Sequence, residues 1–158
     1  MTTEPLATQV LTACRARRWR IATAESCSGG LITAALTDIA GSSDVVDRGF
    51  VTYSNLAKMQ MLGVLPETLS QHGAVSEDVA REMALGALAR ADANVAVAVT
   101  GIAGPGGSEF KPEGRVCFGL ATTDGCVTET VDFGALGRAE VRAATVARAL
   151  TLILRAAS

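Results

Sequence analysis

Three potential nucleophiles stand side by side in the segment Thr-Ala-Glu-Ser-Cys-Ser-Gly-Gly-Leu. They are the hydroxyl of Ser26, the thiol of Cys27 and the hydroxyl of Ser28. The segment joins an expected strand to an expected helix, and the free backbone N–H groups at a helix start attract anions. A reactive turn and an ordinary helix start capped by serine are both compatible with this pattern.

The residues that flank these nucleophiles bear on that choice. Gly29 and Gly30 allow a ligand to approach the backbone closely, although adjacent glycines are also common in plain turns. Glu25 precedes the anion-attracting turn, where a carboxylate satisfies no evident structural need. The segment Glu25–Gly30 is therefore a candidate binding and catalytic turn.

Lysine is rare in this chain, which contains only Lys58 and Lys111 beside many arginines. Lys58 follows Ser54 by four residues, one turn into an expected helix, and a helix that begins beside the first segment would let its amine reach Ser26 Oγ. Lysine acts as a base when burial or a nearby cation lowers its pKa, whereas arginine keeps its proton at neutral pH. The alternative is an ordinary solvated lysine on a helix surface.

A glycine-rich segment, Thr100–Ser108, follows an apolar run that predicts a buried strand. Ligands of open α/β sheets bind at such strand ends, so Thr100 and Gly101 are candidate binding residues. The segment is not an ATP-binding P-loop, because Gly107 stands where that motif needs lysine and no helix is expected to follow. It is either a rigid loop that binds an oxyanion or phosphate, or a flexible surface loop.

Two arginines open the last expected helix. Arg138 and Arg142 are four residues apart and share one helical face, so they could clamp a phosphate or carboxylate. The single histidine, His72, lies in an expected turn before a helix and is interpreted as a turn residue or a subunit contact. A Ser-Lys pair is therefore a more economical hypothesis than a Ser-His-Asp triad.

The composition limits the class of protein. The chain has 158 residues, of which 49% are apolar and 19% are charged. This length and composition predict a single domain with a hydrophobic core over residues 1–158. A net charge of −2 supplies no positive field for nucleic acid. We expect no membrane partner, because no apolar run is long enough for a span, and a cytoplasmic location, because four cysteines occur without a secretion signal. Because no two of the four cysteines form a C-x-x-C pair, the cysteines predict neither a metal site nor a metal cofactor.

Apolar periodicity and turn residues predict alternating helices and strands. Helices are expected over 6–18, 31–39, 55–62, 76–90 and 138–155, and strands over 19–24, 48–53, 94–100, 116–123 and 126–133. Asp124-Gly125 is a preferred two-residue turn and predicts an antiparallel hairpin at Val116–Phe133, with Thr123 opposite Cys126 and Cys117 near Asp132. The pattern predicts an α/β fold, a three-layer α/β/α sandwich around a mixed sheet.

The ordered motifs of the chain resemble those of the CinA C-terminal domain family, in its stand-alone form that acts as a nicotinamide-nucleotide amidohydrolase. The resemblance extends from about Thr23 to Arg142. It rests on T-A-E-S-C-S-G-G, D-I-A-G-S-S, R-G-F-V-T-Y-S-N-x-A-K, L-G-V, H-G-A-V-S-E, V-T-G-I-A-G-P-G-G-S and K-P-E-G-R-V.

The resemblance implies metal-free hydrolysis of the carboxamide of nicotinamide mononucleotide, NMN, to nicotinate mononucleotide and ammonia. It implies Ser26 as nucleophile, Lys58 as base and a homo-oligomer, in pyridine nucleotide salvage. With that substrate, we expect further roles in catalysis or binding for Tyr53, Glu25, Cys27, Ser28, Gly29, Gly30, Asn55, Thr100, Gly101, Arg138 and Arg142.

Two alternatives stay open at the level of sequence. The chain could be a non-catalytic nucleotide-binding or regulatory module that keeps the same fold. It could also be a cysteine hydrolase that uses Cys27, whose thiolate a helix N-terminus could stabilise.

Overall fold

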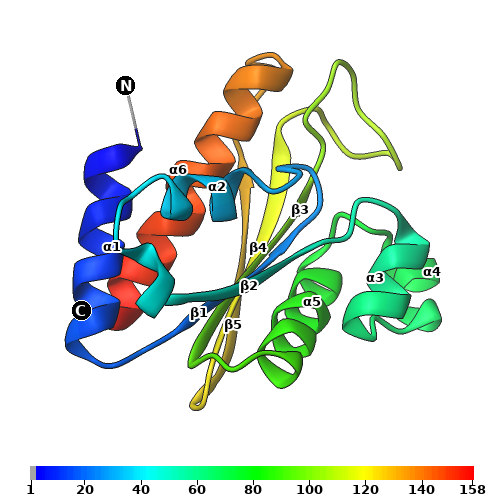
Figure 1. Ribbon diagram of the computed structural model, residues 1–158. Helices are drawn as coiled ribbons and strands as arrows, with labels where there is room; N and C mark the ends of the chain where they lie inside the picture. Colours follow the sequence, from blue (N-terminus) through cyan, green and yellow to red (C-terminus); the bar gives the residue numbers. More distant parts are fainter. Residues whose placement is uncertain (1–2) are drawn as a thin grey trace.

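The computed structural model describes residues 3–158, which form helices on both faces of one sheet (Figure 1). The helices are α1 (Glu4–Ala16), α2 (Leu31–Thr37), α3 (Asn55–Leu62), α4 (Pro66–His72), α5 (Glu77–Arg90) and α6 (Arg138–Ala157), with a short 3-10 helix, η1 (Ser42–Asp44). The strands are β1 (Ile21–Glu25), β2 (Val46–Val51), β3 (Val95–Gly101), β4 (Arg115–Thr122) and β5 (Gly125–Asp132).

The sheet is mixed, with the strand order β2-β1-β3-β4-β5. Strand β1 pairs in parallel with both β2 and β3, whereas the pairs β3–β4 and β4–β5 are antiparallel. Helices α1, α2 and α6 cover one face and α3, α4 and α5 the other, as Figure 1 shows. The expected three-layer α/β/α sandwich is confirmed.

The central strand β3 is apolar on both faces, but its two faces carry side chains of different size. Val95, Val97 and Val99 belong to the core beneath α1, α2 and α6, whereas Ala96 and Ala98 belong to the core beneath α5. The small side chains let α5 pack close to the sheet. At Gly119 on β4, an added Cβ would lie only 2.5 Å from the Ala80 carbonyl oxygen.

The hairpin differs from the expected one by two residues in register. Thr122 pairs with Gly125, so Thr123 and Asp124 form the turn, and the hairpin extends over 115–132 instead of Val116–Phe133. Cys126 lies opposite Ala121, and Cys117 lies opposite Thr130. A shift of two residues leaves every side chain on its expected face, so the apolar alternation could not distinguish the two registers. The thiols of Cys117 and Cys126 are both free.

Helix α4 was missed by the sequence patterns. The segment was interpreted as a turn around His72, but Pro66 opens a helix that His72 ends. Proline suits the first helical positions because its missing N–H has no partner there. The remaining elements begin or end within a few residues of their expected bounds, and α3 has the bounds that the sequence predicted.

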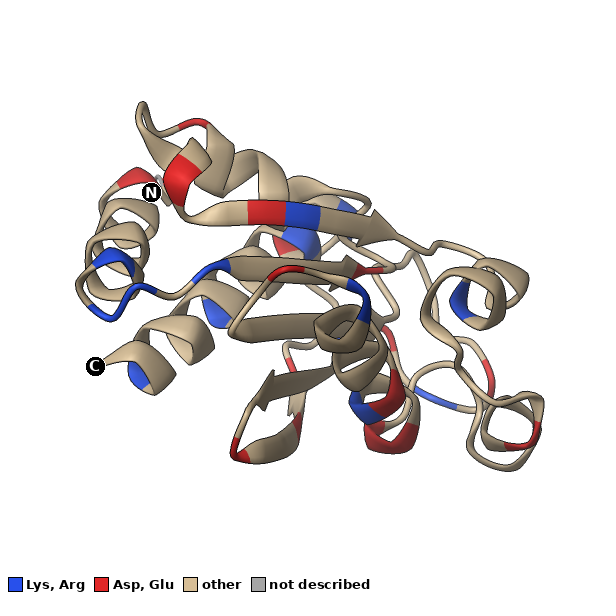
Figure 2. Ribbon diagram, turned by 60° about the horizontal axis from the view of Figure 1, so that its bottom comes forward, with Lys and Arg blue, Asp and Glu red and all other residues tan. Residues whose placement is uncertain are grey.

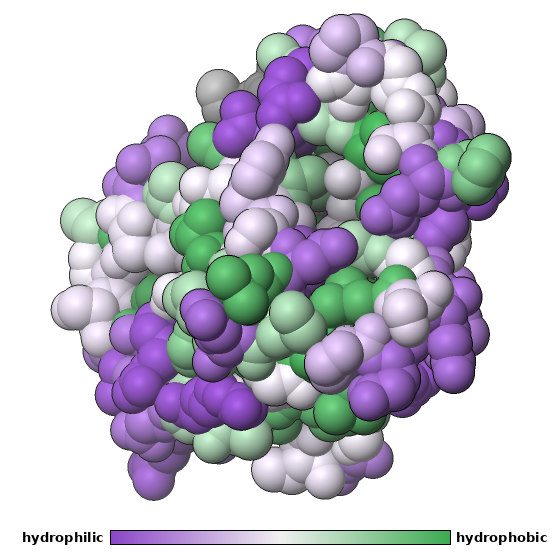
Figure 3. All heavy atoms as spheres, turned by 90° about the vertical axis from the view of Figure 1, so that its right-hand side faces the viewer, coloured by the Kyte–Doolittle hydropathy of each residue, from purple (hydrophilic) through white to green (hydrophobic). Residues whose placement is uncertain are grey.

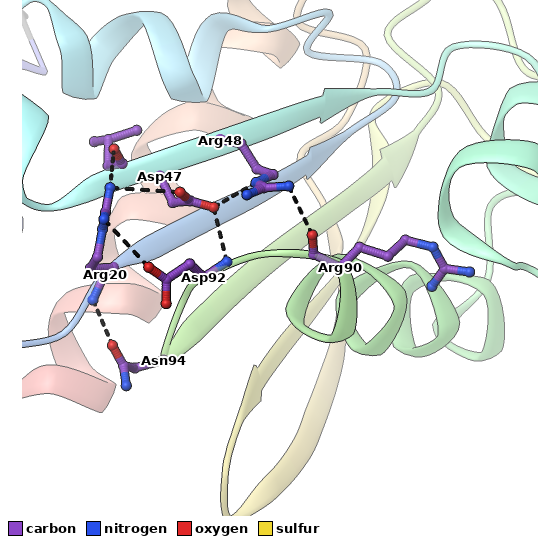
Figure 4. Close-up of polar contacts among 7 residues, drawn as sticks. Arg20, Asp47, Arg48, Arg90, Asp92 and Asn94 are labelled. Carbon is purple, nitrogen blue, oxygen red and sulfur yellow. Dashed lines mark hydrogen bonds and ion pairs between the residues drawn. The ribbon is translucent and has the colours of Figure 1, made fainter.

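A polar network connects the amino ends of the parallel strands (Figure 4). Asp47 on β2 accepts hydrogen bonds from Arg48 Nε at 2.6 Å and from the backbone N–H of Asp92 at 3.0 Å. The side-chain oxygen of Asn94 accepts from the backbone N–H of Arg20 at 2.8 Å. This network fixes the segment before β3 to β1 and β2. Elsewhere, residues of both signs are interspersed along the ribbon (Figure 2).

Candidate active site

The turn after β1 carries the candidate nucleophile at the carboxyl end of the parallel strands. Ser26 directly follows β1, is 7% exposed, and donates its backbone N–H to the carbonyl of Val99 on β3 at 3.2 Å. The carbonyl of Ser26 accepts from the N–H of Gly29 at 3.1 Å. The sheet therefore fixes the backbone of Ser26 while its hydroxyl borders a pocket.

Glu25 has the structural role that its position in the sequence did not reveal. Its fully buried carboxylate accepts from Ser28 Oγ at 2.6 Å and from the N–H groups of Gly30, Ile32 and Thr33 at 3.0–3.1 Å, with a further bond from Thr33 Oγ1. An acidic group at this helix end satisfies N–H groups that have no partner within the helix. Glu25 thus caps α2, and Lys58 forms its hydrogen bonds elsewhere.

Helix α3 delivers the candidate base to the nucleophile. Ser54 caps this helix by accepting the N–H of Ala57, and Lys58 lies one turn further along. The amine Nζ is 2.9 Å from Ser26 Oγ, 3.0 Å from the carbonyl oxygen of Thr52 and 3.3 Å from that of Tyr53. The Lys58 side chain is buried, with 1% of the residue exposed, so the alternative of a solvated surface lysine is wrong.

Burial controls the chemistry of this amine. Burial lowers the pKa of Lys58, and the thiol of Cys27 and the carboxylate of Glu109 oppose that shift in part. A neutral amine has two N–H groups and one lone pair. The carbonyls of Thr52 and Tyr53 can accept the two N–H groups, which leaves the lone pair directed at the Ser26 hydroxyl. This arrangement suits removal of the serine proton.

Cys27 lies beside Ser26 but in an environment that keeps its thiol protonated. Burial raises the pKa of Cys27 to about 11, against the weaker opposing effects of its own backbone N–H and of the cations Lys58 and Arg142. Because the thiolate is the reactive form, this pKa disfavours Cys27 as the nucleophile near neutral pH.

The backbone N–H groups of the nucleophile turn differ in their hydrogen-bond partners. The N–H groups of Gly29 and Gly30 are already bonded to the Ser26 carbonyl and to Glu25. Those of Cys27 and Ser28 have no acceptor among residues 3–158. Because Cys27 borders the pocket and Ser28 is fully buried outside its walls, the N–H group of Cys27 is the candidate donor of an oxyanion-binding site.

The two arginines at the start of α6 contact different parts of the site. Arg138 borders the pocket, where it donates to the Gly104 carbonyl at 2.7 Å and to the Tyr53 hydroxyl at 3.0 Å. Arg142 lies behind the nucleophile turn, where it donates to the carbonyls of Cys27 at 3.1 Å and Ser28 at 3.2 Å. The structure therefore separates the pair that the sequence suggested as one phosphate clamp.

These groups surround a cavity of about 330 Å³, within the size range of small-molecule sites. Figure 3 faces this side of the molecule, where hydrophilic and hydrophobic residues surround a depression. Of the expected site residues, the walls include Ser26, Cys27, Tyr53, Asn55, Lys58, Thr100, Gly101 and Arg138. Ser28, Gly29 and Gly30 belong to the turn but lie outside these walls.

Some wall residues were missed by sequence reasoning. Ala74 and Val75 come from the turn before α5, which Thr100 holds by donating its hydroxyl to the Ala74 carbonyl at 2.8 Å. Glu109 extends the wall beyond the glycine-rich segment. His72 lies outside the wall, with Nε2 3.6 Å from the carboxylate of Asp78. The sequence signal for this turn was the H-G-A-V-S-E motif, which contains Ala74 and Val75 and leads into α5.

Comparison with known proteins identifies the family of this fold and pocket. The CinA C-terminal domain family matches residues 3–157. The chain belongs to this family. The resemblance seen in the motifs is thereby confirmed.

Curated relatives of the chain carry an enzyme name. "Nicotinamide-nucleotide amidohydrolase PncC" of Enterobacter agglomerans is 59% identical over 123 residues, which cover 77% of this chain and 75% of that protein. The protein of the same name from Escherichia coli (strain K12) is 60% identical over 121 residues, which cover 76% and 73%.

Solved structures of CinA-superfamily proteins share the whole fold. Competence/damage inducible protein CihA from Agrobacterium tumefaciens is 52% identical, with a TM-score of 0.93 over 96% of this chain and 93% of that one. A CinA-superfamily protein from Klebsiella pneumoniae 700603 is 39% identical, with a TM-score of 0.95 over 99% and 98%.

Membrane-spanning helices and metal-binding clusters are two further features to consider in this chain. Over residues 3–158, no helix has the length and apolar character that crossing a membrane requires. Within the same residues, His, Cys, Asp and Glu side chains form no group of three or more that could hold a metal ion.

Proposed function

We propose that this protein hydrolyses the carboxamide of NMN to nicotinate mononucleotide and ammonia, through a dyad of Ser26 and Lys58, in pyridine nucleotide salvage. The observation that carries the proposal is the 2.9 Å contact between Ser26 Oγ and the buried Lys58 Nζ at the wall of a pocket. The names of the relatives supply the substrate.

The first half of the reaction forms an acyl-enzyme. Neutral Lys58 takes the proton of the Ser26 hydroxyl, and Ser26 Oγ attacks the carboxamide carbon. The carbonyl oxygen becomes an oxyanion, which the N–H group of Cys27, a residue of the pocket wall, stabilises by about 3 kcal/mol. Protonated Lys58 then gives its proton to the departing nitrogen, and the C–N bond breaks to release ammonia.

The second half of the reaction restores the enzyme. Lys58 takes a proton from water, and the resulting hydroxide attacks the acyl carbon. The bond to Ser26 Oγ breaks, and Lys58 returns its proton to that oxygen. The carbonyls of Thr52 and Tyr53 keep the amine aimed at Oγ throughout, because they accept its other N–H groups.

The remaining residues of the pocket wall bind the substrate. Arg138 is the candidate for the nucleotide phosphate, since its guanidinium borders the pocket and is exposed. Tyr53, whose hydroxyl accepts from Arg138, positions that guanidinium as well as Lys58. Asn55, Thr100 and Gly101 border the remaining space and position the ring and amide. Arg142 supports the nucleophile turn from behind.

The test follows ammonia and nicotinate mononucleotide after purified protein is mixed with NMN and excess EDTA. We expect turnover by the wild type, and a loss of at least about a thousandfold in Ser26→Ala and Lys58→Ala. Cys27→Ala is the matched control, because it alters the adjacent side chain and should keep turnover. Loss of turnover in Cys27→Ala alone would overturn the choice of nucleophile. Binding of NMN without turnover would instead identify a non-catalytic nucleotide-binding module.

A further inference from the structure

Glu109 is the acidic side chain of the pocket wall, and the mechanism above gives it no role. The other charged wall residues are Lys58 and Arg138. Within residues 3–158 the carboxylate of Glu109 has no hydrogen bond or ion pair. Its charge nevertheless acts on Lys58, where it opposes the fall in pKa that burial causes. An acidic residue without an ion pair therefore borders the same cavity as the reactive amine.

The turn that carries Glu109 is fastened to its surroundings. The backbones of Ser108 and Lys111 exchange two hydrogen bonds, at 3.0 and 2.8 Å, and Glu109 adopts a left-handed φ of 54° between them. The amine of Lys111 donates to the carbonyls of His72 and Val75.

Lys111 and a glycine fix where the Glu109 side chain lies. The amine of Lys111 is bonded to two carbonyls and lies beside Gly73, as the Glu109 carboxylate does, but the two groups form no ion pair. The Glu109 carboxylate rests against Gly73, where an added Cβ would lie only 2.5 Å from Oε2. Its place at the cavity is therefore defined by the surrounding turns.

The charges of the wall match those of the proposed substrate. NMN carries a permanent positive charge on the pyridinium nitrogen and a negative phosphate. Arg138 supplies a positive group at the wall, and Lys58 reacts in its neutral form, so Glu109 supplies the negative one. A carboxylate that faces a cation in a partly closed site attracts it more strongly than in bulk water.

We propose that Glu109 is a specificity residue that selects amides attached to a cationic, N-substituted pyridinium ring over the corresponding uncharged ring. The inference rests on the proposed function and names the feature of the substrate that this chain recognises. It assigns Glu109 to binding, whereas bond breaking stays with Ser26 and Lys58.

The test compares two nucleotides that differ in ring charge. NMN is cationic at the ring, and its reduced dihydropyridine form has the same amide and phosphate with an uncharged ring. The measured quantity is kcat/KM for NMN divided by kcat/KM for the reduced form. In Glu109→Gln we expect this ratio to fall about tenfold, as expected for loss of one partly solvated charge contact. Each variant is compared with the wild type, so the intrinsic reactivities of the two amides cancel.

Two further variants separate recognition from loop structure. Glu109→Asp keeps the charge and should keep the ratio within about threefold of the wild type. Glu140→Gln, at the start of α6, removes one exposed carboxylate outside the wall and should leave the ratio unchanged. Higher ionic strength should lower the ratio of the wild type and leave that of Glu109→Gln unchanged, since salt screens exposed charges.

The outcomes decide between charge recognition, a purely structural role and failure of the proposed function. If Glu109→Gln lowers turnover of both nucleotides equally, Glu109 only supports the loop and the specificity proposal is overturned. An unchanged ratio in a folded, active Glu109→Gln would also overturn it, while the amidohydrolase function would stand. Absence of turnover by the wild type on both nucleotides would overturn the proposed function and this inference with it.

Discussion

Charged side chains gather at both ends of the parallel strands, and the two groups differ in their contact with water. At the amino end, Arg20, Arg48 and Asp92 have side chains that are 37%, 49% and 83% exposed (Figure 4). At the carboxyl end, Lys58 is 1% exposed and its amine contacts three oxygen atoms. The fold therefore leaves the side chains of Arg20 and Arg48 partly exposed to water, whereas it buries that of Lys58.

This difference separates stability from chemistry. The ion pair of Arg20 and Asp92 joins two exposed side chains and contributes little energy, because water already solvates both partners. A buried lysine loses hydration, so its charged form becomes less favourable and its pKa falls. The amino end is thus suited to joining strands, whereas the carboxyl end is suited to holding a base.

The largest expected effect comes from replacing the buried amine by an apolar chain of similar length. Lys58→Met should reduce kcat on NMN by about a thousandfold or more, because no other group of residues 3–158 contacts Ser26 Oγ as a base. Its free energy of unfolding should equal or exceed that of the wild type, since folding no longer removes an amine from water. Assays of turnover and urea denaturation check the two results. Strong destabilisation would show that Lys58 is mainly structural.

The pH dependence of activity sharpens the comparison. Below the lowered pKa of Lys58 the amine is protonated and cannot act as a base, so kcat/KM should rise about tenfold per pH unit in this range. Above that pKa kcat/KM should be constant, and the plateau should begin at a pH lower than 10.5, the ordinary pKa of lysine. Between the folded pKa and 10.5, the unfolded state binds more protons, so wild-type stability should rise with pH relative to Lys58→Met. A profile without this rise would contradict a neutral amine as base.

An intermediate effect is expected at the cap of α2. Glu25→Gln replaces a carboxylate that accepts five hydrogen bonds by an amide with a single acceptor oxygen. The free energy of unfolding should fall by about 1–3 kcal/mol. Turnover should fall as well, because the same bonds hold the nucleophile turn. Urea denaturation and NMN turnover measure both. Thr37→Ala at the far end of α2 is the control, and an equal loss of turnover there would refute this role.

The smallest effect is expected at the amino end of the strands. Asp92→Asn removes a charge that contacts Arg20, and stability should change by less than about 1 kcal/mol, with a smaller difference at high salt. Activity should be unchanged, since this end lies away from the pocket walls. Denaturation at two salt concentrations tests the first expectation. A large loss of turnover would show that the two ends are coupled.

Local patterns predicted much of the fold. The apolar run before Gly101 predicted the central strand, and Ser76 predicted the start of α5, which it caps. The register of the hairpin was wrong because strand periodicity is unchanged by a shift of two residues. Helix α4 was missed because it has only seven residues, beginning at Pro66. So short a segment gives too few turns for a helical apolar pattern to be distinguished from a loop.

The site was predicted in part. Residue type and rarity singled out Ser26 and Lys58, and the structure brings them into contact. The two arginines of α6 could not be distinguished, since helical spacing places them on one face without showing what each end of that face contacts. Glu109 carried no signal, because a glutamate in a loop is usually solvated.

By itself, the sequence determined which functional groups are available: a hydroxyl at a glycine turn, one lysine after a strand, and the motifs of the family. Only the tertiary structure decided their chemical states. Burial of Lys58 lowers its pKa, burial of Cys27 raises its pKa, and two carbonyls aim the amine at Ser26. The reason is physical: hydration and hydrogen-bond geometry depend on neighbours that are distant in the chain.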